Sequence, residues 1–219
     1  MARKPKAMFD VHPSVAIVQE WVAGLKDKTG RSLEQWLASI RREKHKDEKA
    51  ARAWLVSKHG LGTYNALWLA QRAFAKDMSL MDDDPERYLS LAPKYVDEQY
   101  EGKRGALRPI FERVVKAGRS LGKDVKVCPC KTIVPLYREH VFAQIKPTTN
   151  TRVDLGLALG ALVKKGTTLP EQLIDTGGFE KKDRITHRVA LTSPEQVDEF
   201  VERWLKKAYD LDVPRVSAR

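Results

Sequence analysis

The chain has 219 residues, of which 42% are hydrophobic and 32% are charged. This composition supplies enough apolar side chains for packed cores and excludes a wholly disordered chain. The formal net charge of +11 favours anionic partners, with nucleic acid first and acidic protein or anionic lipid second. No apolar run approaches the roughly 18–20 residues of a membrane span, and no apolar signal core follows the basic N-terminus. We therefore expect a cytoplasmic protein without a membrane partner.

The two cysteines, Cys128 and Cys130, are separated by a single proline. That spacing gives poor geometry for a mutual disulfide. Two ligands also fall short of a zinc site, because no His or Cys follows at finger spacing. We interpret both residues as small apolar side chains in or near a strand, and expect no metal and no cofactor.

Helical spacing of apolar residues predicts an all-helical domain over residues 1–80. A first helix over residues 14–28 ends at Thr29-Gly30, and Ser32 begins the next helix with a capping box. Asp47 is expected to cap a third helix. The residues expected to face inward are Val15, Val18, Trp21, Val22, Leu25, Leu33, Trp36, Leu37, Ile40, Ala51, Trp54, Leu55, Leu67, Ala70 and Phe74.

A Gly60-Leu61-Gly62 turn separates the third helix from a fourth that begins near Thr63, and Ala66 follows four residues after the second glycine. This spacing resembles the helix-hairpin-helix motif, in which amides of the turn meet a nucleic-acid phosphate. Glycines permit close backbone approach, and a helix N-terminus presents unpaired N–H groups. The alternative is a Schellman-type helix stop. The candidate contacts are Lys58, His59, Gly60, Leu61, Gly62 and Thr63, extended by Arg41, Arg42, Lys44 and Lys46.

The basic residues Arg41, Arg42, Lys44 and Lys46 also have an alternative interpretation. Glu43 and Asp47 are interspersed with the cations, which is also typical of a solvated face beside a helix. Three acids before Pro85 then interrupt the helical pattern, Pro85 suits the first turn of a short new helix, and Leu91-Ala92-Pro93 adds a second break. We place a linker at residues 81–94 and a second domain at residues 95–219.

Alternating apolar residues in the second domain predict an antiparallel meander. Pro135 suggests a bulge or an edge position. A helix precedes the strands, and Ser193-Pro194 is expected to begin another after them. The predicted fold class is α+β: a small N-terminal all-helical bundle, then an antiparallel sheet with two helices covering one face.

A basic constellation falls on or beside these predicted strands. If its outward-facing members shared one face, aromatic rings could stack bases while cations neutralise phosphates. The alternatives are scattered surface charges over core aromatics, or a small-molecule pocket between the sheet and the irregular segment 160–183. The candidate residues are Lys131, Tyr137, Arg138, Phe142, Lys146, Arg152, His187 and Arg188.

Two stretches resemble uncharacterised bacterial families. Residues 15–75, with Thr29-Gly30-Arg31-Ser32 and Lys58-His59-Gly60-Leu61-Gly62, resemble domain-of-unknown-function family 4287. Residues 95–210, with Leu121-Gly122-Lys123-Asp124-Val125 and Phe142–Pro147, resemble domain-of-unknown-function family 5655. The resemblance implies two domains and a bacterial cytoplasmic setting, and it brings no catalytic residues.

The sequence contains none of the common catalytic signatures, such as a G-x-S-x-G elbow, a Walker-type loop or H-E-x-x-H. We therefore expect a non-enzymatic binding protein that contacts DNA or RNA through the helical domain. The first alternative is a small-molecule-binding or enzymatic α/β domain with a helical accessory module. The second is an adaptor with a protein partner, which would show an exposed apolar patch.

Overall fold

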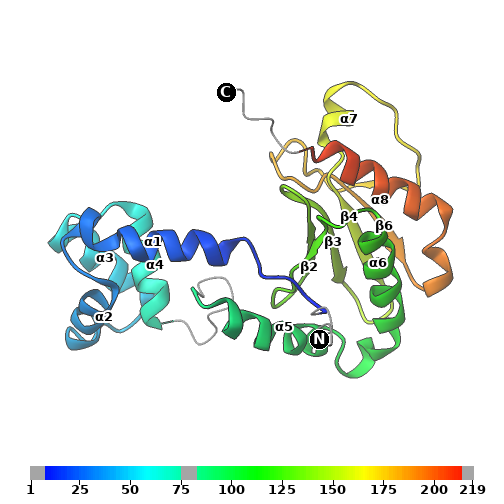
Figure 1. The fold of residues 1–219 in the computed structure, drawn as a ribbon. Coiled ribbons are helices and arrows are strands. Elements are labelled where there is room, and N and C mark those ends of the chain that lie inside the picture. The colour runs from blue at the N-terminus through cyan, green and yellow to red at the C-terminus, as the bar shows by residue number, and fades with distance from the viewer. Residues whose placement is uncertain (1–7, 75–82, 214–219) are drawn as a thin grey trace, which may run out of the picture. The chain divides into compact units, whose positions relative to one another are not determined.

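A computed structural model describes residues 8–74 and 83–213 and divides the chain into two compact units (Figure 1). Residues 13–88 form a helical unit, whereas residues up to 12 belong with those from 89 onward in an α+β unit. Helices come first, and a six-stranded antiparallel sheet with flanking helices follows. The predicted α+β class is therefore confirmed.

The helices of the first unit begin and end where local sequence rules place them. They are α1 (Ser14–Thr29), α2 (Leu33–Arg42), α3 (Glu48–His59) and α4 (Thr63–Phe74). Ser32 and Gln35 form the predicted capping box of α2, and Asp47 accepts the Ala50 N–H at the start of α3. Gly30 ends α1 in the left-handed conformation that glycine adopts most readily.

The core of the helical unit is built around tryptophan. Trp36 is almost wholly buried, and its indole N–H donates to Thr29 Oγ1 at 2.8 Å. Trp21 donates to Asn65 Oδ1 at 3.0 Å, so the two buried indoles keep a polar partner. The prediction for Phe74 was wrong: its side chain is exposed, and Ala66, Leu69 and Ala70 form the buried face of α4.

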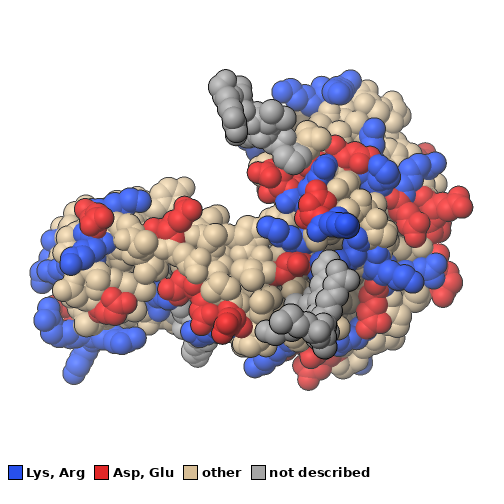
Figure 2. Space-filling model, viewed as in Figure 1, with Lys and Arg blue, Asp and Glu red and all other residues tan. Residues whose placement is uncertain are grey.

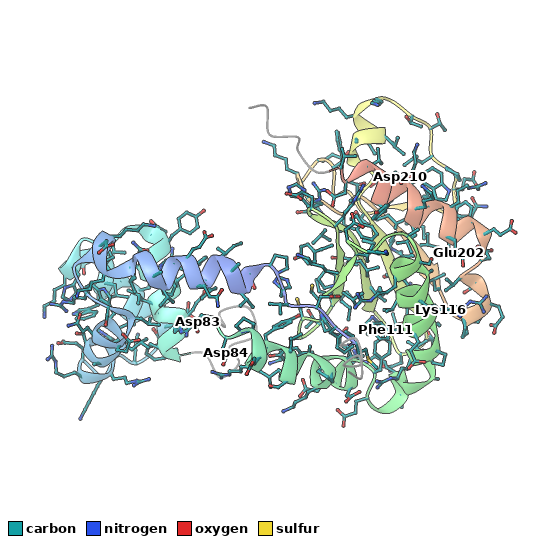
Figure 3. All side chains as sticks on the ribbon, in the orientation of Figure 1. Asp83, Asp84, Phe111, Lys116, Glu202 and Asp210 are labelled. Carbon is teal, nitrogen blue, oxygen red and sulfur yellow. The ribbon has the colours of Figure 1, made fainter. Side chains whose placement is uncertain are left out.

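The predicted linker at residues 81–94 is largely helix α5 (Pro85–Gln99). Asp84, labelled in Figure 3, caps this helix by accepting the N–H groups of Glu86 and Arg87. Pro93 lies inside the helix on its exposed side. The helix begins at Pro85 as predicted, but the predicted break at Pro93 was wrong, because the helix continues through Pro93 to Gln99. The buried positions of α5 still recur at helical spacing: Tyr88, Ala92, Tyr95, Val96 and Gln99.

The sheet has the strand order β1-β2-β3-β4-β6-β5, with every neighbouring pair antiparallel. The predicted meander is thus confirmed. Pro135 is not on an edge strand, because β2 pairs on both sides, but a register shift follows it between Leu136 and Tyr137. The strands are β1 (Lys126–Val127), β2 (Val134–Tyr137), β3 (Val141–Pro147), β4 (Val153–Leu157), β5 (Ile174–Asp175) and β6 (His187–Leu191).

Two helices, α6 (Arg108–Ser120) and α8 (Glu199–Leu211), pack beside each other and against the sheet, as Figure 1 shows. A Cβ on Gly118 of α6 would lie 2.3 Å from Leu136, so a glycine lets this helix approach β2 closely. A short helix α7 (Gly160–Lys164) follows β4, and 3-10 turns lie at Gly102–Leu107 and Pro194–Gln196.

The predicted helix start at Ser193 is only partly correct. Ser193 and Gln196 form a capping box, but it closes the short 3-10 turn, and Val197 leaves the helical conformation. Helix α8 begins afresh at Glu199 because Asp198 caps it by accepting the Val201 N–H at 3.1 Å. Two adjacent capping sequences therefore compete, and the second one nucleates the long helix.

Residues 8–12 were predicted to belong to the helical domain, and this was wrong. Asp10 donates its N–H to the Val127 carbonyl at 2.9 Å, and its carboxylate accepts the Val127 N–H at 2.8 Å. The same carboxylate forms an ion pair with Arg119 of α6. This segment therefore lies along β1 and satisfies backbone groups on an edge strand.

Candidate functional site

The Gly60-Leu61-Gly62 turn joins α3 to α4 in a tight hairpin. Gly60 has a φ of +65° and its N–H donates to the Val56 carbonyl, while the Leu61 N–H donates to the Leu55 carbonyl. The Leu61 side chain is buried and anchors the turn to the core. Gly62 is exposed and is followed by Thr63 at the start of α4. The turn thus serves as a helix stop and also presents the N-terminus of α4.

Gly62 lacks the structural reason that explains Gly60. It does not have a positive φ, and a Cβ built on it would meet none of the described atoms within 4 Å. The next two residues in the chain, Thr63 and Tyr64, are exposed as well, and Tyr64 is 78% exposed. The hairpin therefore offers an unobstructed backbone surface, and the first N–H groups of α4 have no partner within that helix.

His59 does not belong to this exposed surface. Its ring packs edge-on against Trp36 and Trp54, with centroid distances of 5.1 and 4.4 Å. Burial lowers the pKa of His59, and the neighbouring Arg31 and Lys58 lower it further. The charged form of the ring is therefore disfavoured, which weakens His59 as a candidate contact for a phosphate.

The basic run between α2 and α3 is exposed, and Figure 2 shows Lys and Arg gathered over this part of the helical unit. Lys44 has a positive φ of 50°, which turns the chain between the two helices. Asp47 uses its carboxylate to cap α3. Among the described residues, no acidic side chain forms an ion pair with Arg41, Arg42, Lys44 or Lys46.

The aromatic members of the second constellation do not form a stacking surface. Phe142 is fully buried and packs edge-on against Tyr209 of α8. Tyr137 is half-buried, and its hydroxyl lies 3.1 Å from His12 Nε2. His187 is buried, and burial lowers its pKa. The hypothesis of a base-stacking sheet face is therefore wrong, because these rings fill the interior that packing of the helices requires.

The cationic members of that constellation are dispersed and mostly paired. Arg138 binds Asp124 at 2.8 Å and stacks over Tyr209. Asp154 of β4 accepts from both Arg152 and Arg188, and Lys146 lies opposite it on β3. Lys131 and Lys146 are exposed. Several of the predicted cations therefore come together only around Asp154, and the carboxylate of Asp154 partly neutralises their positive charge.

Both cysteines are buried and free, as expected. Burial raises the pKa of Cys128 to about 12 and that of Cys130 to about 11. The thiols are therefore protonated and unreactive at neutral pH. Of the acids before Pro85, Asp82 lies outside the described residues, and Asp83 pairs with Arg72 at 2.5 Å. Within the part of the chain that the structure describes, no group of His, Cys, Asp or Glu could hold a metal ion.

One polar cluster was not predicted. The Asp212 carboxylate after α8 is almost wholly buried and accepts from the His140 backbone N–H at 2.8 Å. It also pairs with the His140 imidazole at 3.1 Å and with the Arg184 guanidinium. These residues are more than 25 positions apart in the sequence, so no spacing pattern reveals them. Beside them lies a cavity of about 610 Å³.

The α+β unit therefore defines a domain with a six-stranded sheet, two covering helices and a cavity at the end of α8. Residues 96–212 match the family model described as "Domain of unknown function (DUF5655)", and the chain belongs to this family. No family match supports the resemblance of the N-terminal part to family 4287. Neither the curated proteins nor the solved structures give a match. Across the described residues, no helix has the length and hydrophobicity to cross a bilayer.

Proposed function

We propose that this protein is a non-enzymatic nucleic-acid-binding protein, and that its helical unit contacts DNA or RNA phosphates through the Gly60–Gly62 turn. The exposed cations Arg41, Arg42, Lys44, Lys46 and Lys58 provide the surrounding positive charge. The α+β unit acts as a second binding module. The observation that carries the proposal is Gly62, a glycine that neither its backbone conformation nor its packing requires.

A glycine at such a position is useful when another backbone or a ligand must approach closely. The alternative, non-functional explanation is that glycine is merely tolerated at a helix N-cap. Two features favour a phosphate ligand over that explanation. The first is the buried Leu61, which fixes the turn so that the amides of α4 face outward in a defined orientation. The second is the local charge.

The hairpin is free of negative charge over a long stretch. Residues 49–74 contain no aspartate or glutamate and include Lys49, Arg52, Lys58 and Arg72. A phosphate that approaches the turn therefore meets the positive end of the α4 dipole and no acid from α4, while the one acid of α3, Glu48, lies at the opposite end of that helix. Contacts of this kind neutralise phosphates without reading bases, so we expect binding with little sequence preference and a steep dependence on salt.

The test compares two glycine variants by fluorescence anisotropy with duplex DNA, single-stranded DNA and RNA at 50 and 200 mM salt. Gly62→Ala adds a methyl group to the exposed turn, and we expect at least a tenfold loss of affinity. Gly24→Ala is the matched control, because a Cβ there meets only the flexible Lys28 side chain of α1 and should leave affinity unchanged.

Circular dichroism must show that Gly62→Ala folds normally, as the open space around Gly62 predicts. Three outcomes would reject the proposal. The wild-type chain could fail to bind all three nucleic acids at 50 mM salt. Binding could be insensitive to salt, or Gly62→Ala could bind as tightly as Gly24→Ala. A small-molecule function for the α+β unit is favoured by a separate observation, the cavity beside Asp212.

A further inference from the structure

The cavity beside Asp212 lies entirely within the α+β unit. Its walls come from the turn between β4 and α7, from residues 179–184 and from the last turn of α8. Figure 1 shows α7 near the C-terminal end of α8. The small residues Gly160, Ala161 and Ala208 keep the space open, and Phe179 and Leu211 add larger apolar surface. A volume of about 610 Å³ is within the usual range of small-molecule pockets.

Arg184 is held in a fixed orientation at the wall of this cavity. Its Nε donates to the Val141 carbonyl at 2.8 Å, and its Nη2 donates to the buried Asp212 carboxylate. Asp212 is in turn fixed by the His140 backbone N–H and imidazole. The other terminal nitrogen, Nη1, forms no hydrogen bond with any of the residues that the structure describes. The guanidinium therefore keeps N–H donors for a ligand while its position is set by the protein.

The segment that carries Arg184 is strained and closely packed. Lys182 also lines the cavity and has a positive φ of 59°, which costs a non-glycine residue about 1 kcal/mol. The Asp183 N–H donates to the Gly178 carbonyl at 2.7 Å, and a Cβ on Gly178 would lie 2.2 Å from the Ile185 carbonyl oxygen. A lysine kept where glycine would fit better indicates that the ammonium group has a use.

We propose that this cavity, the Arg184 pocket, binds a small organic anion. Arg184 and Lys182 hold its carboxylate or phosphate group, and its apolar part lies against Phe179 and Leu211. The planar fork of an arginine suits both of these oxyanions. Asp212 does not oppose an anion because its charge is already paired with Arg184.

The remaining acids in the wall, Glu180 and Asp183, repel any anion, and they repel a ligand with many negative charges the most. A nucleic acid strand would bring several phosphates to a rim that carries two carboxylates, and its bulk exceeds the cavity. The ligand of the Arg184 pocket is therefore a small molecule. This proposal is independent of the nucleic-acid function assigned to the helical unit.

The experiment titrates the full chain with three probes and follows backbone amide signals by NMR. Benzoate and phenyl phosphate combine a flat apolar ring with the two candidate oxyanions, and benzamide is the neutral control. We expect benzoate, phenyl phosphate or both to shift the signals of residues 158–161 and 179–184 with a millimolar or lower dissociation constant. Benzamide should bind at least tenfold more weakly. The anion that binds more tightly shows whether the ligand of the pocket carries a carboxylate or a phosphate group.

Four variants separate anion recognition from folding. Arg184→Gln should weaken anion binding at least tenfold, whereas Arg113→Gln on the exposed side of α6 should not. Arg184→Gln also removes the ion pair with the buried Asp212 and therefore lowers stability. Ala161→Trp provides a second test, because it fills the cavity and leaves the ion pair intact. Lys182→Gly should unfold at a higher denaturant concentration than wild type, because the strain is removed, yet bind the anion more weakly.

The proposal is overturned if neither anion shifts these signals at 10 mM. It is also overturned if benzamide binds as well as benzoate, because the pocket would then be merely apolar. Unchanged anion binding in folded Ala161→Trp would place the ligand elsewhere. Unchanged binding in Lys182→Gly would remove Lys182 from the site.

Discussion

The helical unit and the α+β unit are both basic, but their cations have different partners. In the α+β unit, arginines 108, 119, 138, 152, 184 and 188 all form ion pairs with acidic residues of the same unit. In the described part of the helical unit, the corresponding pair is Arg72–Asp83, and the cations between α2 and α3 have no acidic partner. Figure 2 shows the two signs interspersed over the α+β unit.

This difference teaches that net charge is a poor guide to where a polyanion would bind. The helical unit, residues 13–88, contains 13 Lys and Arg against 11 Asp and Glu, and the remainder of the chain contains 27 against 18. The α+β unit carries most of the net positive charge, yet six of its arginines pair with acidic residues of the same unit. In the described part of the helical unit, Arg41, Arg42, Lys44 and Lys46 form no ion pair with an acidic residue. The predictions below test this comparison, from the largest expected effect to the smallest.

The largest effect is expected on the stability of the α+β unit when the pH is lowered, and His12 is the residue responsible. Burial lowers the pKa of His12 from 6.5 to about 4, so the folded state favours the neutral ring beside Tyr137. The stabilisation is fully present above pH 6.5 and is lost as the pH falls towards 4. Between pH 7 and pH 4.5 it amounts to about 2–3 kcal/mol.

Urea unfolding of the wild type and of His12→Gln at both pH values measures this loss. The variant, which cannot titrate at this position, should lose about 2–3 kcal/mol less than the wild type on acidification. An NMR titration of the His12 ring gives its pKa directly. A value near 6.5 would contradict the prediction.

Removing Asp154 should reveal the structural role of the paired arginines. Asp154→Asn leaves Arg152, Arg188 and Lys146 close together without their shared carboxylate. We expect β3 and β4 to lose about 2 kcal/mol of protection in hydrogen exchange, since the arginines remain partly hydrated. The exposed Arg108–Asp97 pair supplies the control, and Asp97→Asn should cost less than about 1 kcal/mol. Equal effects would show that burial of the carboxylate does not matter.

The two glycines of the hairpin should differ in stability. Gly60→Ala places a Cβ in the left-handed conformation and should cost about 1–2 kcal/mol. Gly62→Ala should change stability by less than about 0.5 kcal/mol. Tryptophan fluorescence reports this unit well, since Trp21, Trp36, Trp54 and Trp68 all lie in it. A large loss in Gly62→Ala would mean that this glycine is structural, and would undermine its proposed role in binding.

The smallest stability effect is expected where the cations are unpaired. The double variant Arg41→Gln/Arg42→Gln should alter the free energy of unfolding by less than about 0.5 kcal/mol. If both residues contact phosphates, it should also reduce the slope of log affinity against log salt by about 1.8.

The control for this prediction is Arg113→Gln/Lys116→Gln on the exposed side of α6, where Lys116 is labelled in Figure 3. It removes the same charge from the α+β unit and should leave the salt slope unchanged. Equal slopes for the two double variants would break the comparison between the units, because binding would then respond only to total charge.

Local rules predicted much of the fold. The capping box of Ser32, the Asp47 cap and the Gly60 stop are interactions between near neighbours, so sequence spacing reveals them directly. The strands were predicted for the same reason, since their inward residues alternate. Helix α5 was expected to be short because Pro93 was interpreted as a break, although Tyr88, Ala92, Tyr95 and Val96 already had helical spacing.

The candidate sites were likewise predictable from the sequence only in part. The hairpin was found from its glycine spacing, but the packing of His59 depends on Trp36 of another helix as well as on Trp54 of its own helix. The proposed stacking face failed because strand alternation gives the side of a residue and does not say what covers that side. Phe142 is covered by α8.

By itself, the sequence determined the helical ends, the strand pattern, the α+β class and the exposed hairpin, since these follow from interactions within a few residues. Only the tertiary structure decided which cations are paired, that residues 8–12 complete the sheet edge, and that His140, Arg184 and Asp212 meet beside a cavity. The physical reason is that burial and ion pairing depend on distances between residues far apart in the chain. Spacing along the sequence carries no information about those distances until the elements are packed.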